Sequence, residues 1–378
     1  MLLSQFFSDL QKIRLLGLLR RGLKISLLMG LVLFLVFSWA HGAAWAADRV
    51  SRLPAGNAIT DGKALLRYAL PIDNGLIRDV QISLEDISNQ LRGKRWTAVT
   101  KDVAKVAGIL RDHQTDLVNS VAPAQQPQAQ ALISELQAGI GTLQTAIEAK
   151  DKPAIAVERS KLLDRVGALE ELMVQKFPFP VPAAYSNLPQ LKGRATIAIE
   201  TSKGPLTVVV DGYSAPVTAG NFVDLVNRGF YNGLKFIRAE ESYVLQFGDP
   251  DGPEQGFVDP KTGQYRAIPL EVLVRGDSEP TYGITLEDAG RYRDQPVLPF
   301  SSYGALALAR PGDDPNGGSS QVFFFLFEPE LTPAGLNLLD GRYAVFGYLT
   351  EGRDVLEKLK EGDKIESAKV IQGLENLA

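Results

Sequence analysis

Apolar residues recur every three or four positions through the first half of the chain, from about residue 57 to residue 177. The clearest stripes lie at 96–110, 132–147 and 162–173. This spacing places each set on one face of an α-helix, and such faces bury one another when helices pack. The pattern therefore predicts an N-terminal bundle of four or five helices over 57–177 that run up and down.

A second interpretation of these stripes is a zipper that pairs with a helix of a partner protein. We prefer the bundle, because a lone helix cannot bury its own stripe. Prolines at alternate positions, Pro178, Pro180 and Pro182, then force an extended chain and exclude helix. Residues 178–189 are thus predicted to form a stiff linker between two domains.

From residue 190 onward the pattern changes to short runs in which polar and apolar residues alternate. The runs at 194–200 and 206–210 flank Gly204-Pro205, which marks a turn, so we expect them to form a hairpin. Further short strands and few helices follow, as is typical of a β-barrel. The whole chain is therefore predicted to be an α+β multidomain protein, an N-terminal all-α helical bundle followed by an antiparallel β-barrel at 190–378.

The N-terminus has the pattern of an export signal. Basic residues end at Lys24, an apolar run covers 25–40, and the small-x-small sequence Ala44-Trp45-Ala46 follows. Signal peptidase substrates have these three parts in this order. We therefore predict that residues 1–46 are removed on export. The alternative is a retained membrane anchor, since the apolar run nearly spans a bilayer.

The amino-acid composition limits the kinds of catalytic and metal sites that the chain can form. The chain has no cysteine and only two histidines, His41 and His113, which excludes disulfides, thiol catalysis and a histidine-based triad. No carboxylate cluster has the spacing of a metal site, so we expect neither a metal nor a cofactor. Residues 1–46 hold five basic residues and one acidic residue, so the remainder carries a formal net charge of −8 instead of −4. That charge argues against binding to nucleic acid.

Six short motifs follow one another in the second half of the chain. The central motif reads Phe236-Ile237-Arg238, then Tyr243, then Gln246-Phe247-Gly248-Asp249. The other motifs lie at 215–222, 229–233, 304–310, 319–324 and 339–347. In order and spacing these motifs resemble the cyclophilins, a family of peptidyl-prolyl cis-trans isomerases.

The layout as a whole resembles the large thylakoid-lumen cyclophilins of cyanobacteria and chloroplasts, with an export signal, a helical domain and an insertion at about 251–300. The resemblance implies a cyclophilin-like barrel that acts on Xaa-Pro segments of client proteins, photosystem II subunits among them. It implies a location in the thylakoid lumen, with the periplasm as the alternative. It also implies a contact between the helical and barrel domains that regulates the cleft.

Rotation about an Xaa-Pro bond crosses a barrier of roughly 18–20 kcal/mol, because it breaks amide resonance. The twisted amide localises a lone pair on the proline nitrogen, to which a guanidinium can donate without losing its charge. The resemblance gives this catalytic role to Arg238 and gives Gln246 the role of holding the substrate carbonyl. The residues that it places around the proline ring are Tyr243, Leu308, Ala309, Phe323, Leu339 and, at the rim, Tyr343.

At five positions the chain departs from the family pattern. Ile237 and Tyr343 stand where histidines are usual, Tyr243 where phenylalanine is, Leu308 where methionine is, and Leu338 where tryptophan is. Arg238 and Gln246 remain, so we expect isomerase activity that is low or conditional. The alternative function is a non-catalytic, proline-binding assembly factor. Its cleft would be masked or used for binding, with the helical domain as a partner-binding module.

Overall fold

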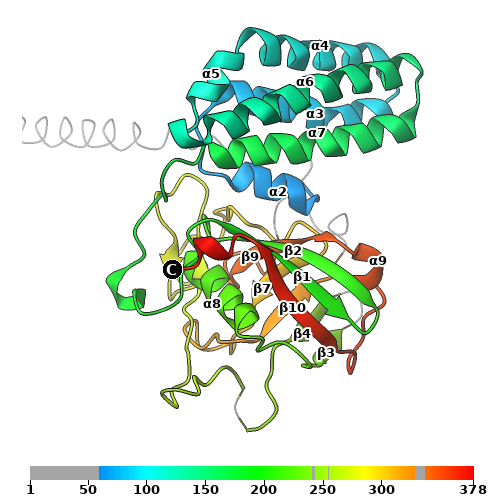
Figure 1. The fold of residues 1–378 in the computed structure, drawn as a ribbon. Coiled ribbons are helices and arrows are strands. Elements are labelled where there is room, and N and C mark those ends of the chain that lie inside the picture. Colours follow the sequence, from blue (N-terminus) through cyan, green and yellow to red (C-terminus); the bar gives the residue numbers. More distant parts are fainter. Residues whose placement is uncertain (1–58, 241–242, 254, 328–336) are drawn as a thin grey trace, which may run out of the picture. The chain divides into compact units, whose positions relative to one another are not determined.

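The computed structural model describes residues 59–240, 243–253, 255–327 and 337–378 (Figure 1). All of them belong to one compact unit, Arg52–Ala378. The predicted export signal at 1–46 lies outside the described residues. Within the described part of the chain, no helix is both long enough and apolar enough to cross a membrane.

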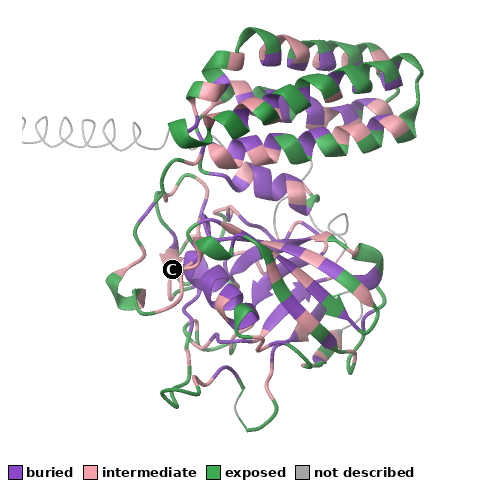
Figure 2. Cartoon of the chain, viewed as in Figure 1, coloured by how far each residue is buried: buried purple, intermediate pink, exposed green. Residues whose placement is uncertain are grey.

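The predicted helical bundle is confirmed. Its four long helices carry their apolar stripes inward and their polar residues outward, as the burial colours of Figure 2 show. Asn74 and Asp151 begin two of these helices, and their side chains accept hydrogen bonds from the backbone N–H groups of Ile77 and Ala154. The helices are α2 (Gly62–Ala69), α3 (Gly75–Arg92), α4 (Trp96–Asp112), α5 (Gln114–Asn119), α6 (Gln126–Glu148) and α7 (Lys152–Leu172), with the 3₁₀ turn η1 (Pro123–Gln125) before α6.

The predicted antiparallel β-barrel is also confirmed. Eight strands pair in the order β10-β1-β2-β9-β7-β8-β4-β3. The Phe236 N–H donates to the Asp363 carbonyl at 2.9 Å, which joins the start of β3 to the segment before β10. The strands are β1 (Arg194–Thr201), β2 (Gly204–Asp211), β3 (Phe236–Glu240), β4 (Val244–Phe247), β7 (Ala305–Leu308), β8 (Val322–Phe325), β9 (Val345–Glu351) and β10 (Ile365–Gln372).

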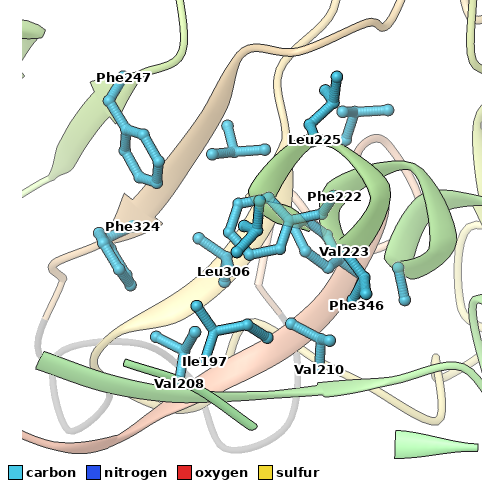
Figure 3. Close-up of a cluster of buried hydrophobic side chains, with 14 of the residues drawn as sticks. Ile197, Val208, Val210, Phe222, Val223, Leu225, Phe247, Leu306, Phe324 and Phe346 are labelled. Carbon is cyan, nitrogen blue, oxygen red and sulfur yellow. The ribbon is translucent and has the colours of Figure 1, made fainter. Parts of the chain in front are cut away.

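The interior of the barrel is filled by alternate residues of its strands and by one face of α8 (Pro216–Asn227) (Figure 3). Phe222 of α8 packs against Phe346 of β9, with ring centroids 5.3 Å apart. Because side chains alternate between the two faces of a strand, the residues between these core positions must point outward. That outer face carries the candidate site.

The remaining elements are short. The predicted linker contains a single 3₁₀ turn, η2 (Ala183–Tyr185), and the Tyr185 ring lies 5.3 Å from that of Tyr282 in the insertion. The insertion holds a two-stranded sheet of β5 (Glu271–Val272) and β6 (Thr281–Tyr282). The helix α9 (Arg353–Leu356) follows β9, and the 3₁₀ turn η4 (Leu374–Asn376) lies near the C-terminus.

Candidate active site on the outer face of the barrel

Strand register brings four side chains into one row on the outer face of the barrel. Arg238 on β3 is paired with Gln246 on β4, and Gln246 is paired with Phe323 on β8. Phe323 is paired in turn with Ala307 on β7. Residues that lie directly opposite one another on neighbouring strands point to the same face of a sheet. The row therefore places a guanidinium, an amide and an aromatic ring side by side.

The amide of Gln246 belongs to a hydrogen-bond network. Its Nε2 lies 2.6 Å from Oε1 of Gln321, the residue that precedes β8. Nε2 of Gln321 donates at 2.9 Å both to Oδ1 of Asp249 and to the backbone carbonyl of Gln255. Gln246 is half-buried, so this network holds a polar group at the edge of an apolar surface.

Phe323 forms the apolar centre of the site and is only 5% exposed. Its ring stacks on Phe300, with centroids 6.0 Å apart, and lies perpendicular to the Tyr343 ring at a centroid distance of 5.5 Å. Leu339 and Ala309 pack at the margin of the same apolar cluster. The site thus has an apolar wall next to Arg238 and Gln246, as binding of a proline ring requires.

The turn that carries Leu339 and Tyr343 is tied to Phe300 by a buried carboxylate. Asp340 accepts hydrogen bonds from the backbone N–H of Phe300 at 2.8 Å and from that of Asn337 at 3.2 Å. Burial raises the pKa of Asp340 to about 6, although both hydrogen bonds oppose that rise. The carboxylate fixes the spacing between two walls of the site and titrates in mildly acid solution.

Tyr343 has a second neighbour on its face. The Arg310 guanidinium lies 5.1 Å from the centroid of the Tyr343 ring, at a distance suited to a cation–π contact. Nε and Nη2 of Arg310 donate to the carbonyl of Arg342 at 2.9 and 2.8 Å. Tyr343 is therefore held between Phe323 and Arg310.

Not every expected residue lies against Phe323 in this row. Leu308 lies in the interior of the barrel, opposite Val322, and packs in the inner core. Tyr243 is 38% exposed, and its ring meets Phe325 edge-on at 5.9 Å instead of meeting Phe323. Leu338 is 86% exposed and contributes no wall to the site.

Sequence reasoning missed several residues of the site: Ala307, Val244, Phe300 and Gln321. Strand alternation could have found the first two. Ala307 and Ala309, the residue after β7, are two positions apart and point to one side of the chain, so Leu308 between them points to the other side. Val244 lies two positions before Gln246 and has the same orientation. Phe300 comes from the insertion, and no local pattern places it beside Phe323.

A second outer row, next to the first, is covered by a segment from the helical part of the chain. The row contains Val244, Phe325, Ala305 and Tyr348, paired across β4, β8, β7 and β9. Leu65 and Leu66 of α2 are buried in the same apolar cluster as these residues and Phe323. A Cβ at Gly62 would lie 2.8 Å from Cβ of Tyr348, so only glycine allows α2 to begin this close to β9.

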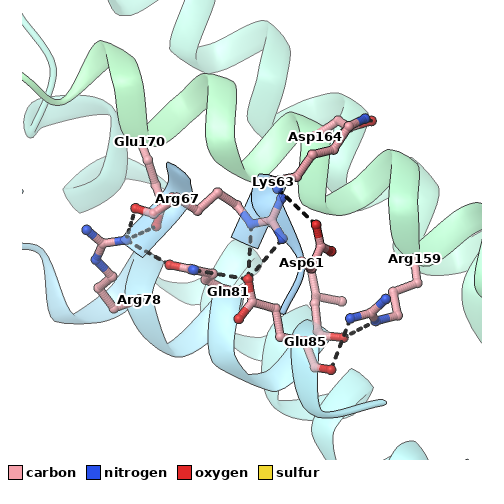
Figure 4. Close-up of polar contacts among 10 residues, drawn as sticks. Asp61, Lys63, Arg67, Arg78, Gln81, Glu85, Arg159, Asp164 and Glu170 are labelled. Atoms are coloured by element: carbon pink, nitrogen blue, oxygen red, sulfur yellow. Dashed lines mark hydrogen bonds and ion pairs between the residues drawn. The ribbon is translucent and has the colours of Figure 1, made fainter. Parts of the chain in front are cut away.

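The opposite side of α2 is held by charged groups of the bundle (Figure 4). Arg67 forms an ion pair with Glu85 of α3 at 3.0 Å, and Lys63 forms one with Asp164 of α7 at 3.3 Å. The short helix α2 therefore contacts the outer face of the barrel on one side and α3 and α7 on the other.

A buried carboxylate reinforces this contact (Figure 4). Arg78 donates to the carbonyls of Arg67 and Leu70 at 2.8 and 2.9 Å, and forms an ion pair with Glu170 at 3.1 Å. Burial raises the pKa of Glu170, while the charge of Arg78 opposes the rise and favours the carboxylate. On the barrel side, Arg194 donates to the Leu66 carbonyl and forms an ion pair with Asp211 at 2.7 Å.

Comparison with known proteins matches each half of the chain to a protein family. Residues 61–174 match the family described as "Peptidyl-prolyl cis-trans isomerase CYP38-like, PsbQ-like domain", and residues 196–375 match the cyclophilin-type peptidyl-prolyl cis-trans isomerases. The putative thylakoid lumen peptidyl-prolyl cis-trans isomerase sll0408 of Synechocystis is 55% identical, over 95% of this chain and 96% of its own length. The chloroplastic peptidyl-prolyl cis-trans isomerase CYP38 of Arabidopsis thaliana is 45% identical, over 87% of this chain and 78% of its own.

Proposed function

We propose that this chain, which belongs to the CYP38-like cyclophilin-type peptidyl-prolyl cis-trans isomerases, catalyses rotation about Xaa-Pro bonds in exported client proteins. The observation that carries the proposal is the row in which Arg238 and Gln246 stand beside the buried ring of Phe323. Relatives named for the thylakoid lumen and the chloroplast support the lumen as the place of action. Photosystem II subunits are proposed as clients on the family resemblance.

The chemistry needs no covalent step. Phe323, Tyr343 and Leu339 hold the proline ring, and Gln246 holds the carbonyl of the peptide. Arg238 then donates to the proline nitrogen as the amide twists, when that nitrogen gains a lone pair. Because this hydrogen bond is strongest in the twisted state, it lowers the barrier instead of only tightening substrate binding.

The activity is proposed to be conditional, because α2 and the insertion complete an apolar layer over the outer face. Phe323 is almost fully buried beneath Phe300, in the cluster that Leu65 and Leu66 join. A proline ring can contact Phe323 only when α2 or the insertion moves away from it. The same burial favours a second function, a non-catalytic assembly factor that binds proline segments and uses its helical domain to contact partners.

The test is NMR exchange spectroscopy on a short peptide with one Ala-Pro bond, mixed with the full chain. Uncatalysed isomerisation takes tens to hundreds of seconds, so exchange cross-peaks between the cis and trans signals require a catalyst. We expect such cross-peaks, at a rate below that of an unobstructed site. Signals that shift on binding without exchanging would instead support the non-catalytic factor.

A further inference from the structure

The orientation of the Gln246 amide is set by the residues around its neighbour Gln321. A glutamine amide has a donor end and an acceptor end, and its neighbours decide which way each end points. Nε2 of Gln321 has two partners at 2.9 Å, Oδ1 of Asp249 and the carbonyl of Gln255. An ionised carboxylate and a carbonyl can only accept, so the donor end of Gln321 must face them.

The acceptor end of Gln321 therefore faces Gln246. Its Oε1 can only accept, and Nε2 of Gln246 lies 2.6 Å from it. This contact places the donor end of Gln246, not its carbonyl, on the side of Gln321. One N–H of Gln246 is used in the contact, and the second N–H on the same nitrogen remains for a peptide carbonyl.

The Gln255 carbonyl is a fixed acceptor because the start of the insertion is clamped to the segment before β8. The backbone N–H of Phe257 donates to Oγ of Ser319 at 3.0 Å. At Gly256 an added Cβ would lie 2.6 Å from Cβ of Ser319, so the two backbones approach as closely as glycine permits. The Phe257 ring is buried beneath the Arg266 guanidinium, 4.6 Å away.

We propose that Gln321 is a positioning residue of the isomerase site, and that the insertion acts on Gln246 through it. This inference rests on the proposed function, since it assigns to Gln246 the task of holding the substrate carbonyl. The order of bonds is directional: Asp249 and Gln255 orient Gln321, and Gln321 orients Gln246. Loss of either acceptor alters the orientation of the Gln246 amide without touching the substrate.

The test removes the donor of Gln321 and then restores one hydrogen bond with its direction reversed. Gln321→Glu keeps size and shape but faces Asp249 and Gln255 with an acceptor, so we expect kcat to fall about tenfold with KM little changed. Adding Asp249→Asn supplies an amide donor to the new carboxylate, and the double variant should recover most of the loss. Asp249→Asn alone is measured beside it, and the recovery in the double variant must exceed any gain that this single change gives. A double variant no more active than Gln321→Glu would overturn the inference, as would an unchanged Gln321→Glu.

A second readout separates this inference from the proposed function. The ¹H and ¹⁵N shifts of the Gln246 side-chain amide report its hydrogen bond whether or not the site turns over. They should move in Gln321→Glu and return toward their original values in the double variant. If they do so while no variant catalyses exchange, the proposed function fails and the positioning stands. If they do not move, the positioning fails whatever the activity.

The proposed effect of the insertion on Gln246 is tested by a matched pair of glycine variants. Gly256→Ala forces a Cβ against Ser319 and should displace the Gln255 carbonyl, moving the Gln246 amide shifts in the same direction as Gln321→Glu. Gly312→Ala, at a position with open space around the added Cβ, should leave them in place. Equal effects of the two variants would contradict a role for the insertion.

Discussion

Tyr343 shows how one residue change is accommodated in the site. Its ring lies perpendicular to that of Phe323 and beneath the Arg310 guanidinium. Arg310 is fixed by hydrogen bonds to the carbonyls of Arg342, Pro311 and Gly312. An imidazole in this place would add a titratable group. The tyrosine ring instead adds apolar surface beside Phe323. This surface favours contact with a proline ring over a polar contact with Arg238.

Asp340 should make stability depend on pH. Its folded pKa of about 6 lies above the ordinary value of 3.8, so the folded state binds the proton more tightly than the unfolded state. The contribution of this proton to the free energy of unfolding is full below about pH 4 and is lost as the pH rises through 6. The difference corresponds to about 3 kcal/mol. In the unaltered chain the free energy of unfolding, measured by urea denaturation, should therefore fall between pH 4 and pH 7. Asp340→Asn should remove this part of the fall.

The control for Asp340 is Asp354→Asn, a similar change at an exposed aspartate on α9. It should leave the pH dependence of the unfolding free energy as it is in the unaltered chain. Parallel curves for Asp340→Asn and the unaltered chain would show that Asp340 is not the titrating group.

The helix α8 begins without a capping side chain of its own, and the insertion supplies one. Glu271 is buried and accepts hydrogen bonds from the backbone N–H groups of Val217 and Thr218, at 3.1 and 2.9 Å, and from Oγ1 of Thr218 at 2.9 Å. A carboxylate at this end of a helix meets unpaired N–H groups and the positive end of the helix dipole. The insertion is thus part of the barrel's stability as well as a loop on its surface.

Replacing Glu271 by alanine should therefore be costly. The change leaves buried donors without acceptors, so we expect the free energy of unfolding to fall by about 3 kcal/mol in chemical denaturation at neutral pH. Glu287→Ala removes an exposed carboxylate from the same insertion, paired with Arg342, and should cost less than about 1 kcal/mol. Similar losses for the two variants would mean that the cap is not what holds this segment.

The sequence pattern predicted elements well where one face of each is solvated. The bundle stripes were correct because each helix has a polar side, and the six motifs located the strands that carry Arg238, Gln246 and Phe323. Strands β7 and β8 behave differently, since every residue in both is buried. Runs such as Ala305–Leu308 do not reveal which residues face the core, and Leu308 was therefore assigned to the wrong face.

The cover over the outer face could not be predicted from local pattern. Leu65 and Leu66 read as part of a bundle helix, yet they pack with strand residues more than 170 positions away. The same holds for Phe300, whose stacking on Phe323 depends on the path of the insertion. These contacts follow from the tertiary fold.

Loosening α2 should raise activity if the cover limits access. Leu65→Ala removes apolar contacts from the cluster that contains Phe323, so we expect faster exchange of an Ala-Pro peptide, by about two- to tenfold. Leu143→Ala, a change of the same kind in the bundle core, should destabilise the chain by a comparable 2–5 kcal/mol without raising the rate. Equal rates for the two variants would contradict control of access by α2.

At the scale of the whole molecule, the chain joins the proposed catalytic face to the element that covers it. Arg238 and Gln246 lie at one end of the outer face, and α2 packs near the other, on Tyr348. The ion pairs of α2 with α3 and α7 connect the helical bundle to that face. A partner that draws α2 away would act on the site without entering it.

The most direct test of the account is the exchange rate of an Ala-Pro peptide with the full chain and with Arg238→Ala. Arg353→Ala, which removes an arginine from α9 next to Tyr303, is the matched control. We predict catalysed exchange by the unaltered chain and by Arg353→Ala, and a loss of at least tenfold in Arg238→Ala. Exchange that persists unchanged in Arg238→Ala would contradict the assignment of this row as the catalytic site.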